Sequence, residues 1–293
     1  MTSEITINPV SHHRRSWRNR TADLLPPEFW RRRSLRLLEC RPTLACVVAF
    51  HRVSDQLRDE LTFPVRAFQR LCKWWRDHYT VLSLDALYAC LQTARPLPAR
   101  ALAITFDDGY VDNAAVAAPI LQSFGLPATF FVTTGLLGTQ QRFPWDSPTP
   151  ATRLMSEAQL RQLERDGFMI GAHTQRHLRL SRTTAAELYE EIVPPLLWLQ
   201  ARLRKPSLDF SFPFGGREDC GERERSMIRA AGYRTCYACY GGGVHSSDDP
   251  FYLQRLAMSP RFHASRGGWE RAYARLLQQE PRPHLVWNNG NGE

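Results

Sequence analysis

The sequence predicts a single-domain α/β protein built on a parallel sheet. Short apolar runs typical of buried strands alternate with longer amphipathic stretches, which favours parallel strands joined by crossover helices. Its 293 residues, 43% of them hydrophobic, suffice for one large domain with its own core. Several expected strands end directly in acidic or histidine residues, and the carboxyl ends of such strands carry the chemistry of α/β barrels.

The elements follow from apolar periodicity and from helix-capping residues. We expect, in chain order, a strand at 45–50, a helix at 65–77, a strand at 80–84, a helix at 85–92, a strand at 101–106, a helix at 112–124, a strand at 128–132, a helix opening at 156, a strand at 168–172, a helix capped near 183–187, a helix near 221–231, strands near 233–239 and 252–257, and a helix near 267–279. No run of 18 apolar residues occurs, so no membrane-spanning helix is expected.

Two adjacent carboxylates end the strand at 101–106. Asp107 and Asp108 are followed by Gly109, which allows a tight bend and a close approach of another group. Neighbouring side chains on a strand point to opposite faces, so the two acids are expected to do different work. One could hold a metal while the other moves a proton. The alternative is a surface Asp-Asp-Gly turn.

Two histidines follow the strand at 168–172. His173 and His177 are four residues apart, a spacing at which two imidazoles can bind one metal. Two histidines and one carboxylate leave coordination positions open, which suits a catalytic site better than a structural one. The alternative is an incidental pair on a polar loop.

These stretches resemble a known family. Residues 105–109 (Thr-Phe-Asp-Asp-Gly), 173–177 (His-Thr-x-x-His) and 210–215 (Phe-Ser-Phe-Pro-Phe-Gly) are similar to motifs of the polysaccharide deacetylases, the NodB-homology group of carbohydrate esterases. The resemblance runs from about Val47 to Pro260 and implies a distorted (β/α) barrel of about seven strands. It divides the chain into a basic N-terminal extension with a short helix, a barrel and a tail, at 1–44, 45–280 and 281–293.

The resemblance also implies a metal-dependent hydrolase that removes N-acetyl groups from a polysaccharide, an oligosaccharide or a lipid-linked sugar. Asp108, His173 and His177 are expected to hold a divalent metal, most simply zinc. Asp107 is expected to act as the base that takes a proton from water. The backbone N–H of Phe214 would add a hydrogen bond to the oxyanion.

The chain departs from the family pattern in its third motif and in its later ones. The arginine that precedes the family's proline and pairs with the base is missing, because Phe210 and Ser211 stand there. We expect Arg255, in the last predicted strand, to replace it and to hold Asp107 ionised. The motifs that supply the general acid have no clear match, which leaves three candidates for that role: His51, His245 and His263.

Two other functions stay open. A related barrel amidohydrolase or deformylase would act on a small cyclic amide or a formylated sugar. A glycan-binding descendant would have lost catalysis, although a pure binder would not need the full set of acids and histidines.

The net charge of +9 raises the question of an anionic partner. No compact basic run is interleaved with stacking aromatics, so nucleic acid is not expected. Residues 1–45 hold nine Arg against four acidic residues, and the stretch 27–38 mixes apolar and basic side chains. We expect the stretch 27–38 to form a short helix that either covers one end of the barrel or lies on an anionic bilayer.

The seven cysteines are scattered through expected helices and strands, which is typical of free thiols in a reducing compartment. Cys236 and Cys239 have a zinc-like spacing but no partner pair, so we expect two buried thiols of a strand. Because the first residues lack a basic region followed by an apolar one, we expect no secretory signal. The expected location is the cytoplasm, with the inner membrane face as an alternative.

Overall fold

The computed structural model describes residues 28–33, 44–93 and 95–278. Residues 28–33 are helical, within the stretch where a short N-terminal helix is expected. The rest of the predicted extension and most of the predicted tail lie outside the described residues, so the domain boundaries stay a prediction.

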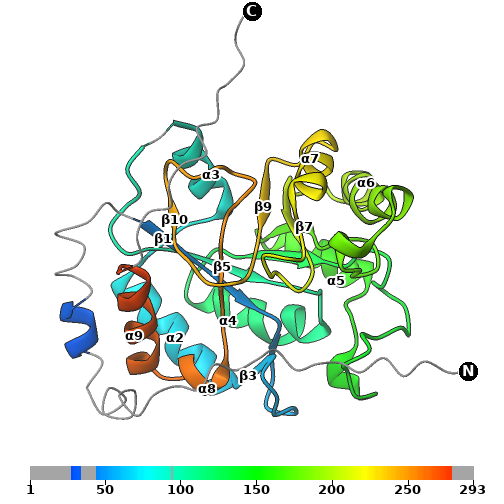
Figure 1. Cartoon of the computed structure of the whole chain (residues 1–293). Helices are drawn as coiled ribbons and strands as arrows, with labels where there is room; N and C mark the ends of the chain where they lie inside the picture. The colour runs from blue at the N-terminus through cyan, green and yellow to red at the C-terminus, as the bar shows by residue number, and fades with distance from the viewer. Residues whose placement is uncertain (1–27, 34–43, 94, 279–293) are drawn as a thin grey trace, which may run out of the picture.

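A curled, mostly parallel sheet forms the centre of the molecule (Figure 1), in the order β10-β1-β5-β6-β7-β8-β9. Short strands β4 and β11 pair with β5 and β1, and only β10 runs antiparallel to its neighbour. The α/β class and the curled parallel sheet are therefore as predicted. The strands of this sheet are β1 (Leu44–Phe50), β4 (Thr80–Val81), β5 (Ala101–Phe106), β6 (Thr129–Val132), β7 (Met169–Ala172), β8 (Asp209–Ser211), β9 (Thr235–Tyr237), β10 (Val244–His245) and β11 (Leu256–Ala257). A separate ribbon pairs β2 (Arg52–Val53) with β3 (Thr62–Phe63).

Helices surround the sheet (Figure 1). Capping boxes begin two of them, as Ser156 with Gln159 and Thr184 with Glu187. The α-helices of the barrel are α2 (Val65–His78), α3 (Leu84–Thr93), α4 (Ala118–Ser123), α5 (Glu157–Arg165), α6 (Ala185–Arg202), α7 (Glu222–Ala230), α8 (Pro260–His263) and α9 (Arg266–Leu276).

Two expected elements differ from the prediction. The helix expected at 112–124 is split into a π-helical turn, Asn113–Ala117, and α4, because Pro119 has no N–H to continue the α-helical bonding. The strand expected at 252–257 pairs with β9 only at Leu253 and then with β1 from Leu256. It changes partner midway, so no continuous ladder forms.

Alternation along the strands separates helix-facing from interior side chains. All seven residues of β1 are buried, as expected for a strand covered on both faces. Phe50 and Phe106 stack with ring centroids 5.3 Å apart and both contact Phe68 of α2. Thr105 and Asp107 point the other way, into the interior of the curled sheet, where both contact the same arginine.

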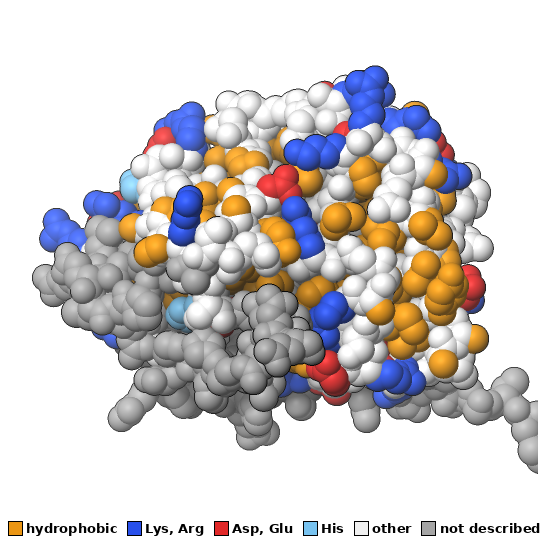
Figure 2. Space-filling model, turned by 90° about the horizontal axis from the view of Figure 1, so that it is seen from above, with side chains coloured by type: hydrophobic (Ala, Val, Ile, Leu, Met, Phe, Trp, Pro, Cys, Tyr) orange, Lys and Arg blue, Asp and Glu red, His pale blue; other side chains and the backbone are white. Residues whose placement is uncertain are grey.

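Charged side chains do not gather into one patch on the face seen in Figure 2, where Lys and Arg are scattered among hydrophobic and uncharged groups. Of the helices described, none combines the length and the apolar character needed to cross a bilayer. The six cysteines in the described part of the chain form no disulfide.

Candidate active site

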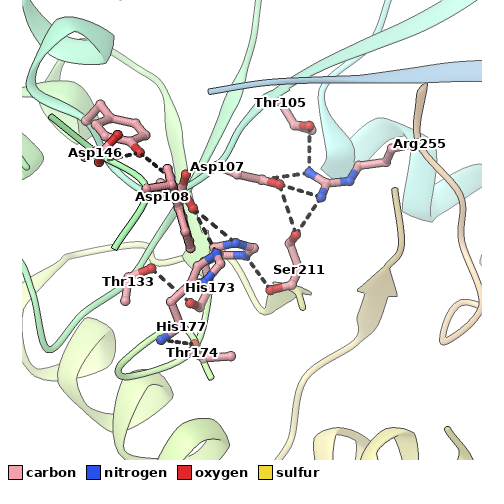
Figure 3. Close-up of polar contacts among 12 residues, drawn as sticks. Thr105, Asp107, Asp108, Thr133, Asp146, His173, Thr174, His177, Ser211 and Arg255 are labelled. Carbon is pink, nitrogen blue, oxygen red and sulfur yellow. Dashed lines mark hydrogen bonds and ion pairs between the residues drawn. The ribbon is translucent and has the colours of Figure 1, made fainter. Parts of the chain in front are cut away.

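Three loops at the carboxyl ends of β5, β7 and β8 meet at one rim of the sheet (Figure 3). Each loop holds at least one non-glycine residue with a left-handed backbone, a conformation that costs roughly 1–2 kcal/mol per residue. Such strain persists where surrounding structure enforces it and is common at functional sites. The residues are Asp108 (φ 75°), Thr174 (φ 64°), His177 (φ 65°) and Phe214 (φ 65°).

Asp108, His173 and His177 form a cluster that could hold a metal. Oδ1 of Asp108 lies 3.4 Å from Nε2 of His173 and 3.3 Å from Nε2 of His177, and one ligand atom from each residue falls within 4.8 Å of the others. Nδ1 of His173 lies 2.7 Å from the carbonyl oxygen of Ser211, which directs Nε2 towards the carboxylate. Both oxygens of Asp108 are buried without a hydrogen-bond partner. A buried carboxylate left in this state is costly, so the donor set fits a cation.

The ionisation of this cluster follows from burial and from the neighbouring charges. Burial alone raises the pKa of Asp108, but the nearby imidazoles of His173 and His177 outweigh burial and hold that pKa well below its usual range. Burial lowers the pKa of His173, yet the carboxylates of Asp107 and Asp108 outweigh it and raise that pKa. Asp108 is therefore ionised at neutral pH, as a metal ligand must be.

The histidine loop is braced by groups outside the cluster. Thr174 accepts the backbone N–H of His177 at 2.9 Å. Thr133, after β6, donates to the carbonyl of His173 at 3.2 Å (Figure 3). The fully buried carboxylate of Glu191, on α6, accepts both the backbone N–H of Arg176 at 2.9 Å and its Nε–H at 2.8 Å. Thr174 thus shares the support of this loop with Glu191, which no sequence motif indicated.

Arg255 lies against Asp107. Its two terminal nitrogens donate to Oδ1 and Oδ2 of Asp107 at 2.8 and 2.6 Å, and also to Thr105 and Ser211 at 3.0 and 2.6 Å. Nε donates to the carbonyl of Ala238 at 3.1 Å. All five N–H groups of the guanidinium thus have acceptors, and the side chain is fully buried. Burial raises the pKa of Asp107, but the charges of Arg255 and His173 outweigh burial and lower it.

A cavity of about 290 Å³ opens over these groups. Its described lining residues are His51, Leu61, Asp107, Asp108, Trp145, His173, His177, Phe212, Phe214, Gly215, Cys239 and Ala257. Burial lowers the pKa of His51, against the opposing charges of Asp108 and Asp107.

Of the three predicted acid candidates, His51 alone lines this cavity. His245 lies in β10, and His263 lines a different cavity of about 260 Å³ beside α8 and α9. Phe214 brings its half-exposed ring to the cavity, whereas the role predicted for its backbone N–H stays a prediction.

The two thiols of the Cys-x-x-Cys stretch have different surroundings. Cys239 lines the cavity, whereas Cys236 is buried in the core shared with the outer helices. Within the described residues, the one group of three or more acidic, histidine or cysteine side chains suited to a metal is the Asp108 cluster.

Comparison with known proteins supports the same family as the motifs. The family model for polysaccharide deacetylase matches residues 94–236. YxkH of Bacillus subtilis, which carries that family's name, is 24% identical over 230 residues, 78% of this chain and 76% of that protein. The poly-beta-1,6-N-acetyl-D-glucosamine N-deacetylase of Staphylococcus aureus strain MRSA252 is 21% identical over 201 residues, 66% of each chain.

Solved structures share the fold. The Streptococcus pyogenes deacetylase PplD, in complex with acetate, superimposes with a TM-score of 0.67 at 18% identity, over 82% of this chain and 100% of that one. IcaB from Ammonifex degensii gives a TM-score of 0.64 at 18% identity, over 79% and 98%. The matched stretch of the polysaccharide deacetylase model spans the carboxylate pair and the histidine pair of this chain, and the deacetylases of known structure share the fold observed here.

Proposed function

We propose that this protein is a metal-dependent hydrolase that removes N-acetyl groups from a carbohydrate. The observation that carries the proposal is the buried, unpartnered carboxylate of Asp108, faced by two imidazoles and adjacent to an arginine-paired Asp107. The poly-N-acetylglucosamine N-deacetylases among the relatives support this substrate class.

Asp108, His173 and His177 would hold the metal, and their oxygen and nitrogen donors suit zinc. A divalent cation there supplies Lewis-acid polarisation of a carbonyl and lowers the pKa of water. Three protein ligands leave open positions on the cavity side, as a catalytic site requires.

Asp107 takes the proton from the attacking water. The pairing with Arg255 holds this carboxylate ionised and fixes both of its oxygens, so the base is present and oriented at neutral pH. The hydroxyl of Ser211 accepts a hydrogen bond from the same guanidinium and keeps it in place.

His51 gives a proton to the departing amine. It is the one histidine besides the two ligands among the described residues that line the cavity. Its carbonyl accepts the side-chain amide of Asn113 at 2.7 Å, which fixes the chain as it leaves β1. The backbone N–H of Phe214 would donate a further hydrogen bond to the oxyanion. Phe214 has a left-handed backbone and lies on the loop that follows β8 at this rim.

A direct experiment combines metal analysis with a screen for released acid. We expect about one zinc per chain and acetate from N-acetylated oligosaccharides or lipid-linked sugars. Formate from a formylated sugar, without acetate, would favour the deformylase alternative. Bound metal with no acid released from any substrate would favour a glycan-binding protein.

We also propose that the protein is located in the cytoplasm. There its arginine-rich N-terminal segment would dock on the anionic inner face of the membrane. Each Arg near such a surface contributes about 1 kcal/mol, and salt screens the attraction. Deleting residues 1–40 should release the protein from anionic vesicles, and raising the salt should weaken binding of the full chain. Binding insensitive to both changes would refute membrane docking.

A further inference from the structure

Aromatic rings form one side of the cavity, and two of them are exposed. Trp145 is 43% exposed and Phe214 is 49% exposed, and their ring centroids are 6.2 Å apart. Buried Phe143 stacks on Trp145, with centroids 4.9 Å apart and planes within 1°. The indole also meets the edge of His177, a proposed metal ligand, at 5.1 Å. Apolar surface exposed inside a cavity gains free energy when a ligand covers it, so these rings indicate where a ligand packs.

A chain of polar contacts holds the indole of Trp145 through its Nε1–H. Its Nε1–H points to the hydroxyl of Tyr110 at 3.4 Å, and that hydroxyl donates to Oδ2 of Asp146 at 2.9 Å. The other oxygen of Asp146 pairs with Arg52, whose guanidinium lies 4.7 Å above the Tyr110 ring (Asp146 is labelled in Figure 3). Arg52 is 2% exposed and also donates to Asp59 and Thr62, both at 3.0 Å.

This network ties the loop of Trp145 to the strand ends that carry the chemistry. Tyr110 follows Asp108 by two residues, and Arg52 directly follows His51. The indole is therefore a fixed surface at a set distance from the reacting groups, although it belongs to a connection of more than twenty residues between β6 and α5.

The charge of the lining restricts what can pack there. The carboxylates of Asp107 and Asp108 are the only Lys, Arg, Asp or Glu side chains among the described lining residues. Among these described lining residues a sugar acid would find no Lys or Arg to pair with, and an unpaired buried charge is costly. The lining therefore fits a neutral ring with an apolar face, as a neutral pyranose has.

We propose that Trp145, with Phe214, forms the subsite that binds the pyranose ring bearing the acetamido group, and that Tyr110, Asp146 and Arg52 position the indole. The inference rests on the proposed function and adds a specificity residue to it. The C–H face of the sugar packs on the indole while the acetamido group reaches the metal ligands and Asp107. A small acetyl compound reaches the same groups but has no ring to pack.

The test compares acetate release from an N-acetylglucosamine tetramer and from ethyl acetate, which carries no ring. We expect Trp145→Ala to raise KM for the tetramer roughly tenfold or more, as loss of a buried aromatic anchor typically does, and to affect hydrolysis of ethyl acetate much less. Trp145→Phe keeps a ring and should retain most of the affinity. Tyr189→Ala is the matched control, because Tyr189 is 48% exposed but lies on α6 and does not line the cavity.

Asp146→Asn tests the positioning network. It leaves the indole in the sequence but weakens the contacts that hold it, so KM for the tetramer should rise while kcat and the rate on ethyl acetate are retained. An unchanged KM would refute the positioning role and leave the subsite standing.

The remaining outcomes each decide one claim. Equal losses on both substrates in Trp145→Ala would show that the residue serves the catalytic geometry rather than sugar binding. A wild-type KM for the tetramer in that variant would overturn the subsite alone. A wild-type enzyme that releases acetate from no N-acetylated oligosaccharide or lipid-linked sugar would overturn the proposed function and this inference with it.

Discussion

The buried pair of Arg255 and Asp107 offers the sharpest test of the assigned roles. Asp107 is 3% exposed, and Arg255→Ala would leave the hydroxyl of Ser211, at 3.5 Å, as its remaining side-chain hydrogen-bond partner. Removing one partner of a buried pair costs about 3–5 kcal/mol. That is a large part of the roughly 5–15 kcal/mol by which proteins are stable. We expect Arg255→Ala to fold, with a Tm about 10 °C below that of the wild type.

The pH dependence carries the mechanistic part of this prediction. In the wild type the pKa of Asp107 is lowered, because Arg255 and His173 outweigh burial. Without Arg255 the burial contribution is less opposed and the pKa rises. The base is then protonated at higher pH, so the acid limb of the kcat/KM profile moves to higher pH.

The sign of the stability effect follows from the same shift. A carboxyl whose pKa is lower in the folded protein stabilises it above the unfolded pKa, about 3.9 for Asp, and this contribution is lost as pH falls through the folded pKa. The difference in unfolding free energy between wild type and Arg255→Ala should therefore be largest near neutral pH. It should shrink in acid, where the unpaired carboxyl of the variant takes up a proton.

Arg100→Ala is the matched control for these measurements. Arg100 is 6% exposed, pairs with the fully buried Glu270 at 2.5 Å, and lies at the other end of β5. It should lower Tm by a comparable amount while leaving the acid limb unchanged. A metal-loaded Arg255→Ala enzyme with a wild-type acid limb would refute the claim that Arg255 holds the base ionised.

Three further experiments separate the remaining roles. Asp107→Asn should keep near-stoichiometric metal but lose a factor of about 10²–10⁴ in turnover, as expected for a missing base, and it should lower Tm because buried Arg255 loses its counter-charge. Asp108→Asn should lose metal, and the opposite pattern would exchange the two roles. His51→Ala should slow release of the amine product while His245→Ala retains full activity, and the assignment of the acid fails if the two variants behave alike. Glu191→Gln loosens the histidine loop and should weaken zinc binding about 10–100-fold in a competition assay, as loss of an outer-shell partner typically does; unchanged affinity would make Glu191 purely structural.

The sequence predicted well what depends on local pattern. The strand that ends at Phe106 and the strand before His173 lie at the predicted places, because buried parallel strands are continuous apolar runs. The proximity of Arg255 to Asp107 could also be anticipated, since the missing arginine of the third motif left a buried carboxylate that required a cation from elsewhere.

Contacts between distant segments could not be predicted in this way. Asp146 meets Arg52 across 94 residues and Tyr110 across 36 residues, and no periodicity relates these positions. Glu191 gave no sign either, because a buried acid on an amphipathic helix cannot be distinguished by pattern from an exposed one. These contacts depend on how the loops fold over the rim, which the spacing of strands and helices does not determine.

The separation of 148 residues between Asp107 and Arg255 has a consequence for the newly made chain. At synthesis rates of about 5–20 residues per second, the carboxylate leaves the ribosome roughly 7–30 s before its cation. Strand β1 waits even longer for β10 and β11, which flank it from the C-terminal part of the chain. A nascent chain that has reached residue 236 already carries Asp108, His173 and His177 but still lacks the arginine that compensates the buried carboxylate of Asp107. The last stretch of the polypeptide therefore decides when, during translation, the barrel can close around its site.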